Sequence, residues 1–152
     1  MSVSVSTTSA DSSGVVLIDI PVVRPDDLGC LLQLPCRPES AFAARQLVSI
    51  ALTAWSAEEL GGVARLLVSE LVANAVRHTG CTRLSVSVTR RKATVWVGVR
   101  DSSGVLPCRT DPTCEAESGY GLGLVEALSS RWGVAWVPHG KWVWFELRTV
   151  KA

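Results

Sequence analysis

Hydrophobic and polar residues alternate with a period of two along four stretches of the chain, which is the pattern of half-buried β-strands. The four stretches are "TRLSVSVTR" (82–90), "TVWVGVRD" (94–101), "GVAWVP" (133–138) and "KWVWFELRTV" (141–150). An earlier stretch, "GCLLQLPCRP" (29–38), is typical of an edge strand, because proline ends it. Short links at 91–93 and at His139-Gly140 predict two hairpins, so at least part of the sheet is antiparallel.

Three other stretches repeat apolar residues every three or four positions, as helices do. They are 39–55, 56–80 and 120–132; in the first, the repeating residues are Phe42, Leu47, Ile50, Ala51 and Ala54. Ser56 and Glu59 match a capping box, although the pair Gly61-Gly62 delays the predicted regular helix to about Val63. Residues 102–119 show no periodicity and predict a long loop. This order predicts an α+β fold, a two-layer α/β sandwich in which the helices cover one face of a mixed, mostly antiparallel sheet.

Composition narrows the class of protein. The chain has 152 residues with a net charge of +1, so we expect neither direct nucleic-acid binding nor a membrane partner. Residues 1–26 are expected to be a flexible segment, in which Asp19 and Pro21 interrupt an apolar stretch, and residues 27–150 form one domain. The start of the chain lacks the features of a signal peptide, which favours the cytoplasm. Five cysteines without a C-x-x-C pair are expected to be reduced thiols.

Two polar residues interrupt the apolar face of the second helix. At 100° per residue, Asn74 lies about 40° from Glu70, on a face shared with Val63, Leu66 and Leu67. A buried, unpaired carboxylate is costly, so this face must meet something that compensates it. One alternative is an ion pair with Arg45 or Arg77. The other is the wall of a pocket, where the carboxylate orients a nucleophile and the amide oxygen ligates Mg²⁺ beside substrate phosphates.

Two further motifs follow along the chain. Asp101 ends a strand before "SSG", which is either a simple turn or a carboxylate that accepts a hydrogen bond from a ligand amino group. Gly119, Gly121 and Gly123 alternate directly before the third helix, where glycines let the backbone approach a phosphate closely. The run is neither the dinucleotide-binding fingerprint nor a P-loop.

In combination these motifs resemble the nucleotide-binding domain shared by gyrase, the Hsp90 chaperone, histidine kinases and the MutL repair protein. "ELVANAV" is similar to its N box, "DSSG" to its first glycine box and "GYGLGL" to its second. The resemblance covers about residues 30–149 and implies a Bergerat-type ATP-binding fold. Within that group, "SELVANAVRHTG" and "GLGLVEALSSRWGV" resemble the anti-sigma-factor serine/threonine kinases.

The resemblance implies roles for individual residues. Glu70 would be the general base or water-orienting carboxylate, and Asn74 would ligate Mg²⁺ that bridges the ATP phosphates. Asp101 would bind the adenine amino group, helped by Gly104. The phosphates would be held by Gly119, Gly121, Leu122, Gly123 and Leu124. Residues 105–118, which include Cys108 and Cys114, would form the lid over ATP.

Other positions complete the predicted ATP site or depart from the family's pattern. Ser103 stands where the first glycine box usually has its first glycine. Arg77 and Lys141 are candidate cationic contacts to ATP, with surface solvation as the alternative. Trp142 stands where relatives often carry threonine, and it either narrows the pocket or faces elsewhere.

The function implied by the resemblance is that of an ATP-dependent protein serine/threonine kinase. It would phosphorylate an anti-sigma-factor antagonist and, when free, sequester a sigma factor, and the family implies a homodimer. The alternative is an ATP-binding switch that holds a protein partner without phosphorylating it. The retention of both Glu70 and Asn74 favours the kinase.

Overall fold

The computed structural model describes residues 28–78, 82–101, 122–138 and 140–149 of the chain. They form a five-stranded sheet with strand order β1-β2-β3-β5-β4. The strands are β1 (Leu28–Pro35), β2 (Arg83–Arg91), β3 (Thr94–Asp101), β4 (Arg131–Val137) and β5 (Gly140–Arg148). All four neighbouring pairs are antiparallel. The predicted edge strand is β1, and both predicted hairpins are present.

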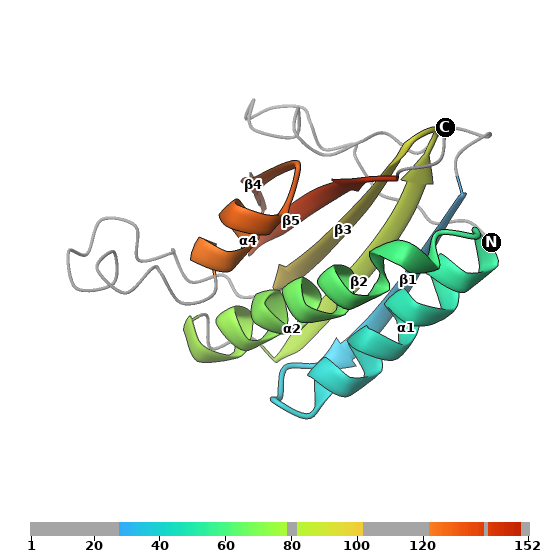
Figure 1. Cartoon of the computed structure of the whole chain (residues 1–152). Coiled ribbons are helices and arrows are strands. Elements are labelled where there is room, and N and C mark those ends of the chain that lie inside the picture. The colour runs from blue at the N-terminus through green and yellow to red at the C-terminus, as the bar shows by residue number, and fades with distance from the viewer. Residues whose placement is uncertain (1–27, 79–81, 102–121, 139, 150–152) are drawn as a thin grey trace.

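Three α-helices lie on one side of this sheet (Figure 1). They are α1 (Ser40–Ala54), α2 (Gly61–His78) and the short α4 (Leu122–Leu128), and a 3-10 helix, η3 (Glu58–Leu60), precedes α2. The α1 and α2 helices pack against each other, and α2 also packs against β3 and α4. The predicted α+β sandwich with helices on one face is therefore confirmed.

The main core lies between the helices and the sheet. It takes the aliphatic positions that alternate along the strands, such as Val86, Val97 and Phe145, which are fully buried. Their strand neighbours point to the opposite side of the sheet, as the two-residue period requires. We call that side the far face. It carries a second cluster of buried residues made of Trp96, Ala135, Trp142 and Trp144.

The first helix is present, but its predicted apolar face is wrong in part. Phe42 and Ile50 are 60% and 67% exposed, whereas Ala44, Val48 and Leu52 are buried. These three positions are four residues apart and form one face of the helix, which packs against α2 and the sheet. Phe42 and Ile50 lie outside that face, so the packing partners and not hydrophobicity alone decided which side of α1 faces inward.

The predicted capping box at Ser56 is also wrong. Ser56 adopts a left-handed backbone conformation with φ of 56°, and the residue that precedes η3 is Ala57. Helix α2 begins at Gly61, two residues before the predicted start at Val63. The short 3-10 turn supplies the entry to the helix that the capping box was expected to provide.

The described cysteines differ from each other. Cys30 is a free thiol, as predicted, and burial raises its pKa, which keeps the reactive thiolate scarce near neutral pH. Cys36, at the end of β1, is disulfide-bonded, so the prediction of a reduced thiol is wrong there. Cys81, Cys108 and Cys114 lie outside the described residues.

Gly98 on β3 leaves room for a tryptophan ring. A Cβ at this position would overlap the Trp96 ring and lie 3.0 Å from the Trp142 ring. We expect Gly98→Ala to lower the free energy of unfolding by about 1–3 kcal/mol, because both rings are buried and cannot yield. The matched control is Gly62→Ala, where a Cβ meets nothing within 4 Å. Helix propensity should make the control more stable by up to about 1 kcal/mol. Urea denaturation measures both changes, and equal stability of the two variants would contradict the prediction.

Candidate functional site

Helix α2 presents Glu70 and Asn74 on the edge of its buried side. Both residues are half-buried. The buried positions of the helix are Ala64, Leu67, Val68, Leu71, Val72 and Ala75. At 100° per residue these centre about 130° from Glu70 and about 90° from Asn74, and Leu66 on the opposite side is 42% exposed. The prediction that the two polar residues occupy the buried stripe is therefore wrong. They lie one turn apart on its shoulder, where solvent or a ligand can reach them.

The alternative of an ion pair to Glu70 receives no support from the described residues. Two ion pairs form between described side chains, Arg131–Glu146 and Lys141–Asp101, and Glu70 takes part in neither. Arg45, a predicted partner, instead donates a hydrogen bond to Ser69 Oγ at 2.9 Å. Ser69 Oγ in turn donates to the carbonyl of Arg65. The half-buried position of Glu70 makes a compensating cation unnecessary.

Asp101 lies at the end of β3, and its carboxylate is buried. In the sheet register it stands between Leu84 of β2 and Lys141 of β5. Leu84 belongs to the core between sheet and helices, so Asp101 is on the helix side of the sheet. Sequence alone left a turn as the simpler explanation of this aspartate. A carboxylate held on the helix side beside the core is a better position for a ligand contact than a solvated turn.

Lys141 Nζ lies 2.8 Å from Asp101 Oδ2, and the two side chains are 15% and 5% exposed. The expectation that Lys141 is solvated at the surface is therefore wrong. A charge-assisted bond of this length fixes the orientation of the carboxylate. The sequence already indicated that Lys141 faces the core, because it shares a strand face with Val143 and Phe145. That Asp101 is its partner could be found only from the register of β3 and β5.

Trp142 does not enter the region around Asp101. It belongs to the far-face cluster, where its ring lies 5.6 Å from that of Trp96. Of the two predicted orientations, the one that faces away from the pocket is therefore observed. The larger side chain at this strand position does not narrow the helix side of the sheet.

Three structural elements meet at one end of the molecule. The last turns of α2, the end of β3 and the start of α4 lie at the same end of the sheet (Figure 1). In α4, Leu122 is half-buried and packs against the core, whereas Gly123 and Leu124 are exposed. The remaining predicted ATP-site positions, Ser103, Gly104, 105–118, Gly119 and Gly121, lie outside the described residues.

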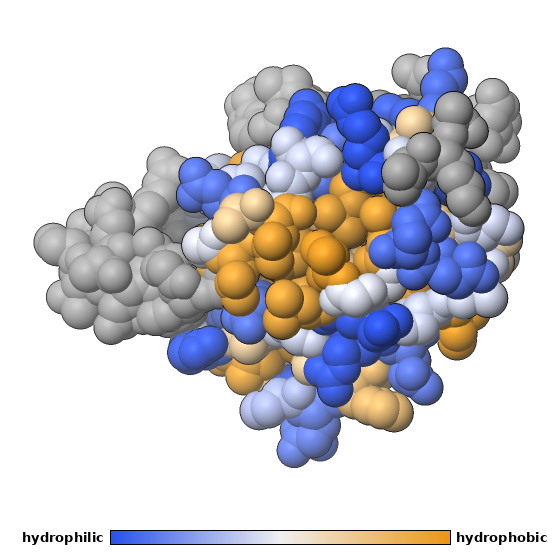
Figure 2. Space-filling view, in the orientation of Figure 1, coloured by the Kyte–Doolittle hydropathy of each residue, from blue (hydrophilic) through white to orange (hydrophobic). Residues whose placement is uncertain are grey.

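The helix side also exposes apolar surface. Figure 2 shows apolar side chains gathered over the sheet in the view of Figure 1. The large apolar residues of α2 and α4 that are exposed are Leu66, Leu124 and Leu128, each about two-fifths accessible.

The described residues contain no cluster of three or more histidine, cysteine, aspartate or glutamate side chains able to hold a metal by themselves. Mg²⁺ commonly keeps waters and substrate phosphates in its shell and needs only one or two protein oxygens. The half-buried amide of Asn74 fits that requirement, so the chemistry of the residues present is compatible with a metal–nucleotide complex.

Comparison with known proteins identifies the class to which this architecture belongs. A sequence profile of the "Histidine kinase-, DNA gyrase B-, and HSP90-like ATPase" family matches residues 62–151, which is more than half of the chain. The chain belongs to this ATPase family. The match begins within α2 and includes both Glu70 and Asn74, Asp101 and the glycine run.

A solved structure supports the fold. The crystal structure of the RsbU and RsbW domains of Rv1364c from Mycobacterium tuberculosis superimposes with a TM-score of 0.62 and 20% sequence identity. The alignment covers 80% of this chain and 32% of that longer chain. No curated protein sequence matches. None of the helices in the described ranges is long and apolar enough to cross a membrane.

Proposed function

We propose that this chain is an ATP-dependent protein serine/threonine kinase that phosphorylates an anti-sigma-factor antagonist and, when free, sequesters a sigma factor. One observation carries the proposal beyond the family. Glu70 and Asn74 stand one turn apart on the accessible shoulder of α2, at the end of the sheet where β3 ends in the buried Asp101. The Glu70 carboxylate is thus available as a general base. The Asn74 amide is available as a metal ligand, and the Asp101 carboxylate is available to accept a hydrogen bond from adenine.

In this proposal the adenine amino group donates a hydrogen bond to Asp101. Lys141 holds the Asp101 carboxylate in place through the 2.8 Å ion pair, so the acceptor is oriented before the nucleotide arrives. Glycines 119, 121 and 123, with Leu122 and Leu124, would offer backbone N–H groups to the phosphates at the start of α4.

Mg²⁺, when bound, would neutralise part of the charge of the ATP phosphates. Asn74 would hold it through its amide oxygen, and Arg77 is the proposed cationic contact at the same end of α2. Glu70 would accept the proton of the attacking serine or threonine hydroxyl. The hydroxyl oxygen then bonds to the γ-phosphorus, the bond from that phosphorus to the bridging oxygen breaks, and ADP leaves.

The protein partners follow from the same proposal. The resemblance of the α2 and α4 segments to anti-sigma-factor kinases supports an antagonist protein as phosphate acceptor and a sigma factor as the sequestered partner. The family also supports a homodimer.

The test of the proposed kinase activity is incubation of the wild-type protein with labelled ATP, Mg²⁺ and candidate antagonist proteins. Label on a serine or threonine of one candidate is expected. Tight ATP binding without transfer to any candidate would favour a binding switch, and absence of ATP binding would overturn both functions.

Asn74→Ala tests the metal role separately. We expect wild-type ATP affinity to fall about ten- to a hundredfold when EDTA replaces Mg²⁺, because a charge-assisted contact worth about 1.5–3 kcal/mol is lost. The variant should bind ATP weakly and equally in both conditions. Calorimetric titration measures the four affinities. The matched control is Ser69→Ala on the same helix, which should keep the Mg²⁺ dependence, and an Asn74 variant that keeps it would show that another group holds the metal.

A further inference from the structure

The far face of the sheet carries three tryptophans that are almost inaccessible. Trp96, Trp142 and Trp144 are 4%, 7% and 3% exposed. The rings of Trp96 and Trp144 are stacked with centroids 6.1 Å apart, and Trp144 also lies over Gly133. All the described helices are on the other side of the sheet (Figure 1). The stacked rings and Arg131 shield part of this surface, and no described helix lies over it (Figure 1).

Polar groups on the far face share this burial. Ser87 and Thr89 of β2 point to the same side and are 2% and 3% exposed. The indole N–H groups of Trp96 and Trp144 and the Nε of Arg100 are buried and have no hydrogen-bond partner. Buried donors are normally paired, so these three groups call for acceptors in whatever covers the face.

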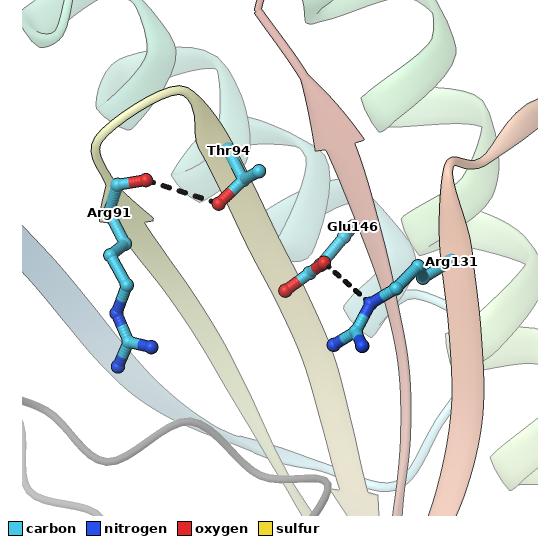
Figure 3. A network of polar contacts seen from close by, with 4 residues as sticks. All are labelled: Arg91, Thr94, Arg131 and Glu146. Carbon is cyan, nitrogen blue, oxygen red and sulfur yellow. Dashed lines mark hydrogen bonds and ion pairs between the residues drawn. The ribbon is translucent and has the colours of Figure 1, made fainter.

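Positively charged residues predominate on the far face. Arg131 Nε pairs with Glu146 Oε1 at 2.9 Å (Figure 3). The guanidinium carbon of Arg131 lies 5.3 Å from the centroid of the Trp144 ring. By strand alternation Arg91, Arg100 and Arg148 are on the same face, with Glu146 as the acidic residue among these strand positions. A segment that covers the far face should therefore carry apolar side chains to meet the tryptophans and acidic side chains to meet the arginines.

The segment directly before β1 has this chemistry. Residues 15–23 read "VVLIDIPVV", and residues 15–27 contain three aspartates, Asp19, Asp26 and Asp27, against one arginine, Arg24. An extended segment also brings one carbonyl acceptor per residue, which is what the unpaired donors need. Pro21 lacks an N–H donor, and therefore leaves no unpaired donor of its own when buried.

The chain enters the sheet at a suitable place. Leu28 is level with Arg90 of β2 and Val95 of β3 in the register, one residue from Trp96. The distance from β1 across two strand spacings to β3 is about 10 Å. Four extended residues, 24–27, span up to about 13 Å. This length is sufficient for residues 15–23 to reach the tryptophans without any rearrangement of β1.

We propose that residues 15–23 of the same chain lie across the far face and cover Trp96, Trp142 and Trp144. This interaction surface is separate from the proposed ATP site, which is on the helix side of the sheet. The segment hides an apolar, arginine-bordered surface that would otherwise be open to association between copies.

The first test uses the full chain labelled with 5-fluorotryptophan, with its six resonances assigned by single Trp→Phe substitutions. The variant Ile18→Asp/Ile20→Asp should shift the resonances of the three covered tryptophans and increase their solvent isotope shift, while Trp55 on the helix side stays unchanged. The control Thr7→Asp/Thr8→Asp adds the same charges upstream and should shift none. Unchanged resonances of the three tryptophans in the Ile18 variant would overturn the proposal. The proposal would also fail if dilution of the wild type shifted these resonances, because a second copy would then be the cover.

The second test does not depend on the folding of a variant with buried charges. p-Benzoyl-L-phenylalanine in place of Ile18 should form, on irradiation, an intramolecular cross-link to the tryptic peptide 93–100 or 142–148. These two peptides carry the three tryptophans. The same probe in place of Thr8 should give less than about a tenth of that yield. A cross-link from position 18 only to peptides of α1 or α2 would place the segment on the helix side and refute the proposal.

Discussion

Glu70→Gln is expected to reduce phosphoryl transfer to the antagonist about 10²–10⁴-fold while ATP affinity changes little. The amide is nearly isosteric with the carboxylate but cannot accept the hydroxyl proton, and general-base catalysis typically contributes this factor. The substitution should not disturb the fold, because Glu70 is half-buried and takes part in neither ion pair between described side chains. Stability should therefore stay within about 0.5 kcal/mol of the wild type.

The measurement combines two assays on the same preparations. Calorimetry gives ATP affinity in the presence of Mg²⁺, and single-turnover transfer of labelled phosphate gives the chemical step. Glu59→Gln, on the exposed 3-10 turn, is the matched control and should transfer at the wild-type rate. Transfer by Glu70→Gln at more than a tenth of the wild-type rate would show that Glu70 is not the base. Loss of ATP binding in Glu70→Gln would instead show that Glu70 contributes to nucleotide binding.

Lys141→Met is expected to destabilise the fold by about 3–5 kcal/mol. Methionine keeps much of the aliphatic stem but removes the ammonium group from Asp101, whose side chain is 5% exposed. Removing one member of a buried pair leaves a desolvated carboxylate without its counter-ion, and the cost is of this order. The variant should also bind ATP more weakly, because the proposed adenine acceptor loses the group that orients it.

Arg131→Met provides the comparison within the same sheet. It breaks the pair with Glu146, in which the arginine side chain is 61% exposed, so the loss should be at most about 1 kcal/mol. Urea denaturation of the two variants measures the difference. Equal losses would show that burial does not set the strength of the Lys141–Asp101 pair. Full stability with weakened ATP binding in Lys141→Met would show that the lysine serves the nucleotide directly.

Several features were predictable because local rules determine them. Alternation in "TVWVGVRD" required a strand with its aliphatic residues on one side, and the short link at 91–93 required a hairpin with its neighbour. Even the common face of Trp142 and Trp144 followed from the two-residue period. The motif around Glu70 and Asn74, together with Asp101 and the glycine run, is sufficient to indicate the ATPase family from the sequence alone.

Other features depended on contacts between distant segments. The helix wheel of α2 could not show which of its apolar positions face the core. The buried ones are the alanine, leucine and valine positions between Ala64 and Ala75, which leaves Glu70 and Asn74 at the side of the helix. The exposure of Phe42 and Ile50 had the same origin, because contact with α2 and the sheet selected the face that carries Ala44, Val48 and Leu52.

The sequence by itself determined the order and type of most elements and the family, since both depend on spacing along the chain. Only the tertiary structure decided that Lys141 neutralises Asp101 and that Trp142 points away from the pocket. Both outcomes depend on which residues of β3 and β5 stand opposite each other, and on which side of the sheet the helices settle. Strand register is a relation between residues 40 positions apart, and no local pattern specifies it.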